Sequence, residues 1–235
     1  MSQLDLLAFG AHPDDVEIGM AGTVIRHSKM GYKCGICDLT LAELSSNGTV
    51  ELRQEEASEA AKVLRLHTRL NLQLPDRGLQ YNSAYVNKIV EIIRTYQPKV
   101  VFLPYHEDRH PDHGNCARLV EEALFSAGIK KYQADQELPP HKVRDIYYYF
   151  INGYEHPSIT VDITSVREEK LKCLQAYKSQ FTLSEDGVDT PLNNGYLETV
   201  LARDTLFGKE TGVKLAEGFY IKKPLLIDNF LGESL

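Results

Sequence analysis

Two short stretches of this sequence combine histidine with aspartate at spacings that suit metal binding or acid–base chemistry. The first is His12-Pro13-Asp14-Asp15 near the N-terminus, and the second is His110-Pro111-Asp112-His113 near mid-chain. Each stretch follows an apolar run typical of a buried strand and precedes a segment with helical character. In a parallel sheet such strand-to-helix junctions share the carboxyl edge, so we expect the two stretches to meet there.

Three of these side chains form a plausible set of metal ligands. His12 and Asp15 are three positions apart at the mouth of a helix, which puts both on one side of its first turn. His113, at the start of the second helix, would supply a third ligand. Two imidazoles and one carboxylate with an open position are typical of a catalytic zinc site, and also of non-haem iron(II). A structural zinc site would instead close with four protein ligands.

The remaining polar residues of the two stretches suit acid–base roles. Asp14 is free of the metal in this interpretation and would act as the general base that takes a proton from the attacking water. His110 would stabilise an oxyanion as an imidazolium and then help to protonate the leaving amine. Asp112 would orient His110 and hold its proton. The alternatives are that His12 and Asp14 only cap the first helix, and that His110 and His113 lie on a surface loop.

Four further residues are weaker candidates for substrate contacts. Arg53 lies early in a helix that begins at the same edge, where it would clamp an anionic group or remain a solvated charge. Asp76 would bind sugar hydroxyls or simply close the turn Pro75-Asp76-Arg77-Gly78. Arg109 and Tyr196 are similar, with an ordinary surface role slightly favoured for both.

The elements that must position these residues alternate regularly over the first half of the chain. We expect strands over 4–9, 33–39, 68–74 and 99–103, each followed by a helix over 16–30, 50–66, 85–96 and 113–128. Consecutive strand–helix units imply parallel pairing, right-handed crossovers and helices on both faces of the sheet. The predicted fold class is therefore α/β, with a Rossmann-like, mostly parallel sheet.

The pattern changes after Gly128. We expect strands over 143–151 and 159–163, then a helix from Val166 to about Ser179 that Ser165 caps, and a last helix from Glu198 to about Phe207. The polar stretch 181–195 is long enough to suggest a mobile lid. A segment over 218–227 closes the chain. We interpret residues 1–235 as one domain, with a core over 1–128 and additional elements over 129–235.

Composition narrows the class of protein. The chain has 235 residues, 43% of them hydrophobic, and a formal net charge of −7, which argues against a nucleic-acid-binding surface. No apolar run approaches the roughly 18 residues of a membrane helix, and no signal peptide is apparent, so we expect a cytoplasmic protein. Cys34 and Cys37 fall on a predicted strand, where residues three apart face opposite ways, so they should not form a redox or zinc pair. Because free cysteines are usually buried, we expect all four cysteines to be buried thiols.

The two His-Pro-Asp stretches, joined to the strands before them, resemble the LmbE-like (PIG-L) family of zinc-dependent N-acetylglucosamine deacetylases over essentially the whole chain. The segments Ser45–Thr49, Glu51–Glu56 and Pro75–Leu79 look most like its bacillithiol-biosynthesis branch. The resemblance implies a small amino-sugar substrate, N-acetylglucosaminyl malate, which is deacetylated to glucosaminyl malate and acetate. It also implies a trimeric or hexameric assembly.

Carried over residue by residue, the resemblance assigns three zinc ligands, His12, Asp15 and His113, with iron(II) as an alternative native metal. It makes Asp14 the general base and His110 the partner of the oxyanion. Arg53 and Asp76 would contact the substrate, Arg53 at a malate carboxylate.

Three alternatives remain open from the sequence. The substrate could be another N-acetylglucosaminide, such as a chitooligosaccharide. The same two-histidine, one-carboxylate set could belong to a non-haem iron oxygenase. The chain could also be a non-catalytic sugar- or nucleotide-binding module, although no G-x-G-x-x-G motif follows the first strand, which weakens the dinucleotide version.

Overall fold

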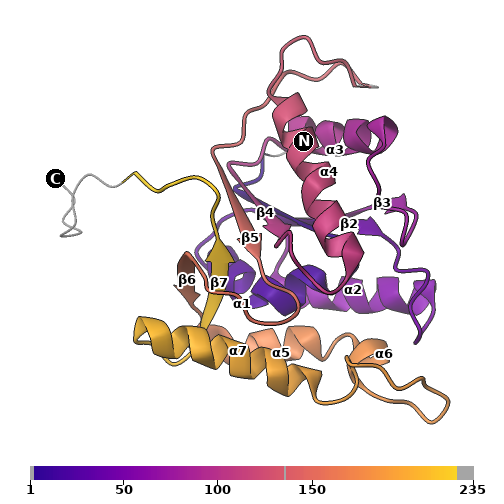
Figure 1. Cartoon of the computed structure of the whole chain (residues 1–235), viewed down its shortest axis with the longest axis vertical. Helices are drawn as coiled ribbons and strands as arrows, with labels where there is room; N and C mark the ends of the chain where they lie inside the picture. Colours follow the sequence, from indigo (N-terminus) through magenta and orange to yellow (C-terminus); the bar gives the residue numbers. More distant parts are fainter. Residues whose placement is uncertain (1–2, 135, 227–235) are drawn as a thin grey trace.

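The computed structural model describes residues 3–134 and 136–226, which form a seven-stranded sheet with helices on both sides (Figure 1). The strand order is β3-β2-β1-β4-β5-β7-β6. The strands are β1 (Leu6–Gly10), β2 (Cys34–Thr40), β3 (Thr68–Leu74), β4 (Val100–Pro104), β5 (Asp145–Tyr149), β6 (Ile159–Asp162) and β7 (Ala216–Tyr220). The helices are α1 (Asp15–Lys29), α2 (Val50–Leu64), α3 (Ser83–Tyr96), α4 (Pro111–Ala127), α5 (Arg167–Leu174), α6 (Lys178–Phe181) and α7 (Tyr196–Thr211).

The sheet is mostly parallel, which confirms the predicted fold class. The first five strands pair in parallel, and only β7 runs against its neighbours β5 and β6. The order reverses between β1 and β4, because β2 and β3 extend the sheet to one side and β5 extends it to the other. In open α/β sheets a crevice forms at such a switch point, outside the carboxyl ends of the strands. The first His-Pro-Asp stretch follows β1 after one residue, and the second follows β4 after the short loop 105–109.

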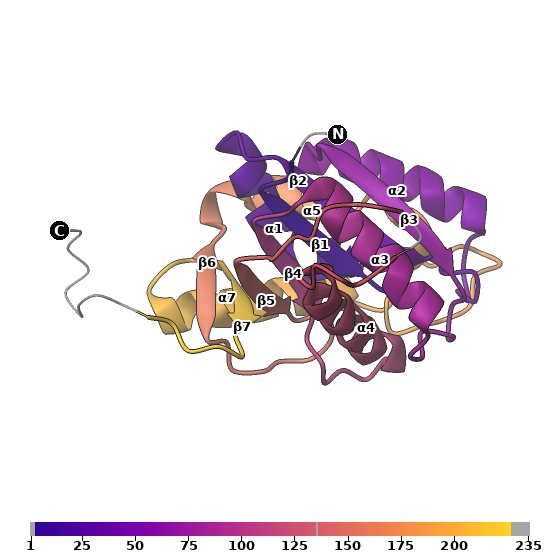
Figure 2. The ribbon, with the colours of Figure 1, turned by 90° about the horizontal axis from the view of Figure 1, so that it is seen from above.

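Helices lie on both faces of the sheet (Figure 2), and each face has its own apolar core. Side chains alternate along β1, so that Leu6 and Ala8 pack with α1, α2 and α5, whereas Leu7 and Phe9 pack with α3 and α4. Cys34 and Cys37 follow the same rule and fall into opposite cores. All four cysteines are free and buried, which confirms their predicted role as core residues.

Helix α1 is kinked, and residues distant in sequence hold the kink. Met20 has a non-helical φ of −153°, and the N–H groups of Gly22 and Thr23 beyond it donate to the Glu217 carboxylate at 2.8 and 2.7 Å. Arg203 donates to the carbonyl oxygen of Ile18 at 3.1 Å. A carboxylate and a guanidinium therefore satisfy backbone groups that the kink releases, and they fix the direction of the first turn of α1, where Asp15 lies.

Two expectations for the second half of the chain need correction. The predicted helix 166–179 is interrupted, because Thr164–Val166 is a 3-10 turn, α5 ends at Leu174 and α6 begins only at Lys178. Ser165 therefore lies within the turn and does not cap α5. The physical reason is Tyr177, whose ψ of 60° breaks the helix and sends its hydroxyl into the core, where it donates to Glu17 at 2.7 Å.

Other elements agree with their predicted positions within a few residues. Thr49 caps α2 by accepting from the N–H of Leu52 at 3.2 Å, and residues 182–195 form a long connection between α6 and α7. Residue 227, the last of the predicted closing segment, lies outside the described residues. Among the residues that are described, no helix combines the length and apolar character needed to cross a membrane.

Candidate active site

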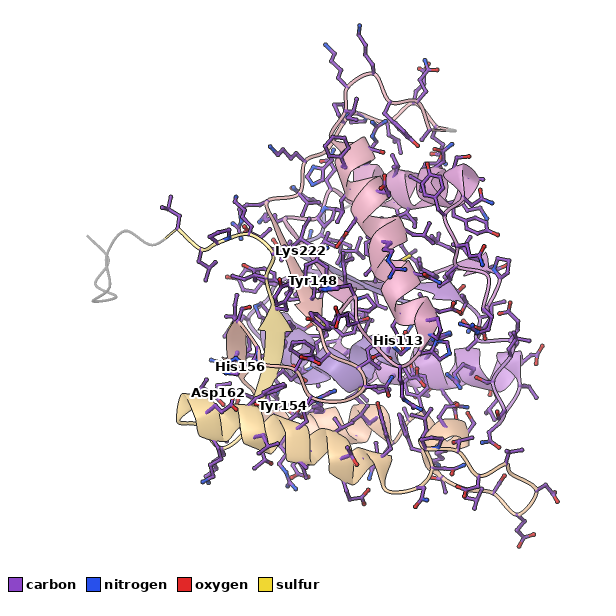
Figure 3. All side chains as sticks on the ribbon, in the orientation of Figure 1. His113, Tyr148, Tyr154, His156, Asp162 and Lys222 are labelled. Atoms are coloured by element: carbon purple, nitrogen blue, oxygen red, sulfur yellow. The ribbon has the colours of Figure 1, made fainter. Side chains whose placement is uncertain are left out.

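A cavity of about 240 Å³ opens at the carboxyl edge of the sheet, at the switch point between β1 and β4. The structure brings nine of the ten predicted site residues to its wall. These are His12, Asp14, Asp15, Arg53, Asp76, Arg109, His110, His113 and Tyr196. The tenth, Asp112, is fully buried behind them. Figure 3 shows His113 at the end of α4 that lies closest to α1 and α2.

A second cavity, of about 540 Å³, lies at the opposite edge of the sheet but offers no comparable chemistry among its described residues. Its charged residues are already paired, Asp5 with Lys99 at 2.7 Å and Arg144 with Asp145 at 2.6 Å. The smaller cavity therefore remains the candidate site, in spite of its size.

The three predicted metal ligands face one another. The Asp15 carboxylate lies between the two imidazoles, with Oδ2 at 3.5 Å from His12 Nδ1 and Oδ1 at 3.1 Å from His113 Nε2. The rings of His12 and His113 have centroids 5.6 Å apart. One ring nitrogen from each of His12, His110 and His113 lies within 4.8 Å of the other two. Such donors are close enough to share one divalent ion.

A further group of possible donors surrounds the other side of His12. Donor atoms of His12, Asp76 and Asp112 also lie within 4.8 Å of one another. The Asp76 carboxylate is 3.2 Å from His12 Nε2, and that of Asp112 is 3.9 Å from the same nitrogen. Asp76 was predicted as a substrate contact, and here its carboxylate also neighbours a predicted metal ligand.

Electrostatics favour a cation at this position. Burial alone would lower the pKa of His12, but the carboxylates of Asp15 and Asp76 outweigh it and raise that pKa to about 10. Burial is likewise outweighed at His113, where Asp15 and Asp108 raise the pKa to about 9. The carboxylates around the two imidazoles thus favour positive charge at this position. The residues present therefore fit a divalent cation, which would supply the same positive charge.

Asp14 does not behave as an ordinary cap of α1. It occupies the N-cap position, but its side chain forms no capping hydrogen bond, and its φ of 127° is rare for a residue with a side chain. The carboxylate accepts instead from Arg53 Nη1 at 3.1 Å. Burial raises the pKa of Asp14 to about 7, against the opposing charge of Arg53. A buried carboxyl that titrates near neutrality is suited to proton transfer.

Arg53 is buried and bonds to protein acceptors through both terminal nitrogens. Nη1 donates to the carbonyl oxygen of Pro13 at 2.8 Å as well as to Asp14, and Nη2 donates to Ser45 Oγ at 3.0 Å. Arg109 is different, because it is exposed at the cavity, and among the residues described none forms an ion pair with it. Of the two arginines, Arg109 therefore has the guanidinium that is more available to a ligand.

His110 is positioned by backbone rather than by the Asp112 carboxylate. It is the N-cap of α4, and its Nδ1 accepts from the N–H of Asp112 at 3.3 Å. The Asp112 carboxylate is occupied by Arg77, through the backbone N–H at 2.7 Å and Nη1 at 3.2 Å. Burial, together with His12 and His113, lowers the pKa of His110. A neutral imidazole whose Nδ1 accepts carries its proton on Nε2, the nitrogen free to donate.

Two residues that sequence reasoning missed complete the site. The Asp108 carboxylate lies 2.9 Å from His113 Nδ1, so the imidazole is held between two carboxylates. Asp108 also accepts from the backbone and side chain of Asn152 at 3.0 and 2.8 Å, and Asn152 Oδ1 in turn accepts from Tyr196 at 2.9 Å. Asp108 could have been predicted from its place in the loop just before His110. Nothing in the sequence pointed to Asn152, because its position depends on the pairing of β5 with β4.

Comparison with known proteins places the chain in a family. Residues 7–124 match the family model PIG-L, described as GlcNAc-PI de-N-acetylase. The chain is 30% identical to a diacetylchitobiose deacetylase of Thermococcus kodakarensis, over 91% of this chain and 81% of the relative. It is 27% identical to a probable N-acetyl-alpha-D-glucosaminyl L-malate deacetylase 2 of Bacillus subtilis, over 72% of this chain and 80% of the relative.

Solved structures agree with this comparison. A conserved protein of Thermus thermophilus has a TM-score of 0.88 and 35% identity, over 99% of this chain and all of that one. The N,N'-diacetylchitobiose deacetylase of Pyrococcus horikoshii has a TM-score of 0.81 and 27% identity, over 92% and 82% of the two chains. The similarity therefore extends over nearly the whole chain.

Proposed function

The chain belongs to the PIG-L family, so it is an amide hydrolase that deacetylates GlcNAc-containing substrates, and we propose that His12, Asp14, Asp15, His110 and His113 form its active site. The observation that carries this proposal is the placement of the buried Asp14 carboxyl, which forms no capping bond, in the same cavity as His12, Asp15 and His113. Family membership favours a hydrolase over the oxygenase and binding-module alternatives.

We assign the metal ligands to His12, Asp15 and His113, and zinc is the metal we propose, with iron(II) as an alternative. A divalent cation held there would polarise the amide carbonyl and lower the pKa of water at the site. The protein's contribution is to orient the donors. Asp15 faces both imidazoles, and Asp108 holds the ring of His113 from its other nitrogen.

Asp14 accepts the proton of the attacking water in this proposal, and the proton then passes to the amine nitrogen as the C–N bond breaks. Its pKa near 7 keeps a useful fraction ionised at neutral pH while leaving the carboxylate basic. Arg53 holds the Asp14 carboxylate in place, because its Nη1 donates both to that carboxylate and to the carbonyl oxygen of Pro13. His110 donates from Nε2 to the oxygen that gains negative charge, as a neutral imidazole rather than the imidazolium we expected from the sequence.

For the substrate, we propose a GlcNAc glycoside with an anionic aglycone, N-acetylglucosaminyl malate, as in bacillithiol biosynthesis. The support is the exposed Arg109 at the cavity, which offers a guanidinium to a carboxylate, together with the Bacillus relative. Arg53 is the weaker candidate for this contact, because its terminal nitrogens already bond within the protein. Asp76 and Tyr196 remain candidates for the sugar.

Diacetylchitobiose is the second candidate substrate, and a specific observation favours it. The relative from Thermococcus kodakarensis is 30% identical over most of the chain and carries that activity in its name. The cavity is also rich in neutral polar groups, including Ser45, Ser46 and Thr190, which suit sugar hydroxyls.

Acetate release from a panel of N-acetylglucosaminides tests both the proposed reaction and the proposed substrate. The panel contains N-acetylglucosaminyl malate, diacetylchitobiose and N-acetylglucosamine, and metal analysis of anaerobically purified protein accompanies it. We expect acetate release that a chelator abolishes and that added zinc restores. Arg109→Ala should impair the malate substrate more than diacetylchitobiose, and equal losses would remove Arg109 from aglycone recognition. Absence of acetate release from every member, with metal bound, would contradict the proposed function.

A further inference from the structure

Hydrogen bonds from a single side chain attach the stretch 183–194 to the rest of the described residues. This stretch, the central part of the connection between α6 and α7, extends beyond α6 in Figure 1. Its other hydrogen bonds are internal, such as those of Asn193 with Val188 and Thr190. Among the described residues, the hydrogen bonds that tie 183–194 to the remaining chain are both made by Asn47.

The side-chain amide of Asn47 bonds to the backbone of Val188 with one donor and one acceptor, as a neighbouring β-strand would. Its Nδ2 donates to the carbonyl oxygen of Val188 at 2.9 Å, and its Oδ1 accepts from the N–H of Val188 at 2.8 Å. One primary amide thus satisfies both backbone groups of one residue. A side chain with a single hydrogen-bonding group could not replace it, because the donor and acceptor are needed together.

Asn47 is itself held from the opposite side. The backbone carbonyl oxygen of Asn47 accepts from Gln180 Nε2 at 3.0 Å. The neighbouring Ser179 is fixed by the buried Glu56 of α2, which accepts from its N–H at 2.7 Å and from its hydroxyl at 2.6 Å. Gly48, with a φ of 77°, allows this close approach, since a Cβ there would lie 2.9 Å from that of Ser179. The attachment point is therefore rigid, although the stretch it holds is exposed.

The attached stretch forms part of the cavity wall. Thr190 and Leu192 line the same cavity as Asn47 and the predicted catalytic residues Asp14 and His110. The cavity has a volume of about 240 Å³, below the roughly 300–1,000 Å³ of pockets that take drug-sized ligands. A wall held in this position therefore restricts the size of the group that can be attached to a bound amino sugar.

We propose that Asn47 is a specificity-determining residue, which holds residues 183–194 against the cavity and thereby limits the size of the group linked to the amino sugar. This inference rests on the proposed deacetylase function. When Asn47 is removed, the stretch can move outward, so that larger glycosides gain access while the reacting groups of His12–Asp15 and His110–His113 stay in place.

The test compares Asn47→Ala with Asn87→Ala in the full-length, metal-loaded protein. Asn87 is a matched control, because its side chain also takes part in a hydrogen bond, from the Tyr132 hydroxyl at 2.7 Å, but lies on α3 away from the cavity. Two measurements are made on each variant: amide hydrogen exchange over 182–195, and the ratio of kcat/KM for triacetylchitotriose to that for N-acetylglucosamine.

In Asn47→Ala we expect exchange over 182–195 and the substrate ratio each to rise about tenfold, from the loss of two ordinary hydrogen bonds. Asn87→Ala should change neither. Faster exchange with an unchanged ratio, or unchanged exchange, would overturn the role of Asn47 in specificity. Failure of the wild-type protein to release acetate from any N-acetylglucosaminide would instead overturn the proposed function, so the two failures can be told apart.

Discussion

Asp14 carries a backbone strain that its surroundings impose. Its φ of 127° is unfavourable for any residue with a Cβ, and no capping bond compensates for it. Strained residues of this kind persist only where the rest of the structure fixes them, and they cluster at functional sites. Sequence reasoning separated Asp14 from the metal ligands of the proposal. It could not reveal the strain, because no local sequence pattern predicts a positive φ at an aspartate.

Strain at Asp14 predicts a difference between two substitutions. Asp14→Gly and Asp14→Ala both remove the carboxylate, but only glycine adopts a φ of 127° without a steric penalty. The glycine variant should therefore unfold with a free energy about 1 kcal/mol higher than the alanine variant. Urea denaturation of both proteins measures the difference. Equal stability would mean that the backbone at Asp14 is not strained.

The pH dependence of activity follows from the same residue. Burial raises the pKa of Asp14 to about 7, and a base must be ionised to accept a proton, so activity falls as the pH drops through the pKa. A bound cation adds positive charge and favours the carboxylate, which moves this acidic limb downward. We expect the limb of the kcat/KM profile at or below pH 7. A limb well above that pH would argue that another group is the base.

The strand–helix units were predicted closely from the sequence, whereas the junctions between distant elements were not. Apolar runs and helical periodicity locate β1 to β4 and α1 to α4 within a few residues, because local burial decides them. The interruption at Tyr177, the kink at Met20 and the contact of Asn152 with Asp108 depend on partners more than 40 residues away. No local pattern encodes such contacts.

Another junction between distant residues joins β3, β2 and α1 through Arg69 of β3. Its guanidinium contacts Glu17 of α1 at 2.5 Å and Asp38 of β2 at 2.8 and 3.1 Å, and both carboxylates are buried. Arg69→Met leaves two buried carboxylates without their cationic partner, although Glu17 keeps its bond from Tyr177. We expect the free energy of unfolding to fall by about 3–5 kcal/mol, measured by chemical denaturation. Arg144→Met, which removes an arginine from an exposed pair, should change little, and a similar loss in both variants would contradict the importance of burial.

At the scale of the whole molecule, the fold and family are established, while the number of domains and the assembly remain predictions. The additional strands β6 and β7 continue the same sheet, because β7 pairs with β5. This continuity supports one domain. Several large apolar side chains remain exposed, including Phe125 at 76% and Leu206 at 53%. Such residues are compatible with contacts between copies of the chain.

The resemblance to the family predicts a trimer or a hexamer. Light scattering on the purified protein should therefore give a mass three or six times the chain mass of 26.6 kDa. Coverage of exposed apolar surface by neighbouring subunits is the physical reason for expecting assembly. A mass of one chain at micromolar concentration would contradict the prediction.

The central claim is that Asp14 acts as the base beside a metal that other residues hold. It is tested most directly by measuring metal content and acetate release together in Asp14→Ala. Because His12, Asp15 and His113 are unchanged, the variant should bind as much metal as the wild type, while kcat falls by about 100- to 10,000-fold, the usual worth of a general base. Loss of the metal together with the rate would make Asp14 a ligand, and retention of both would show that another group takes the proton.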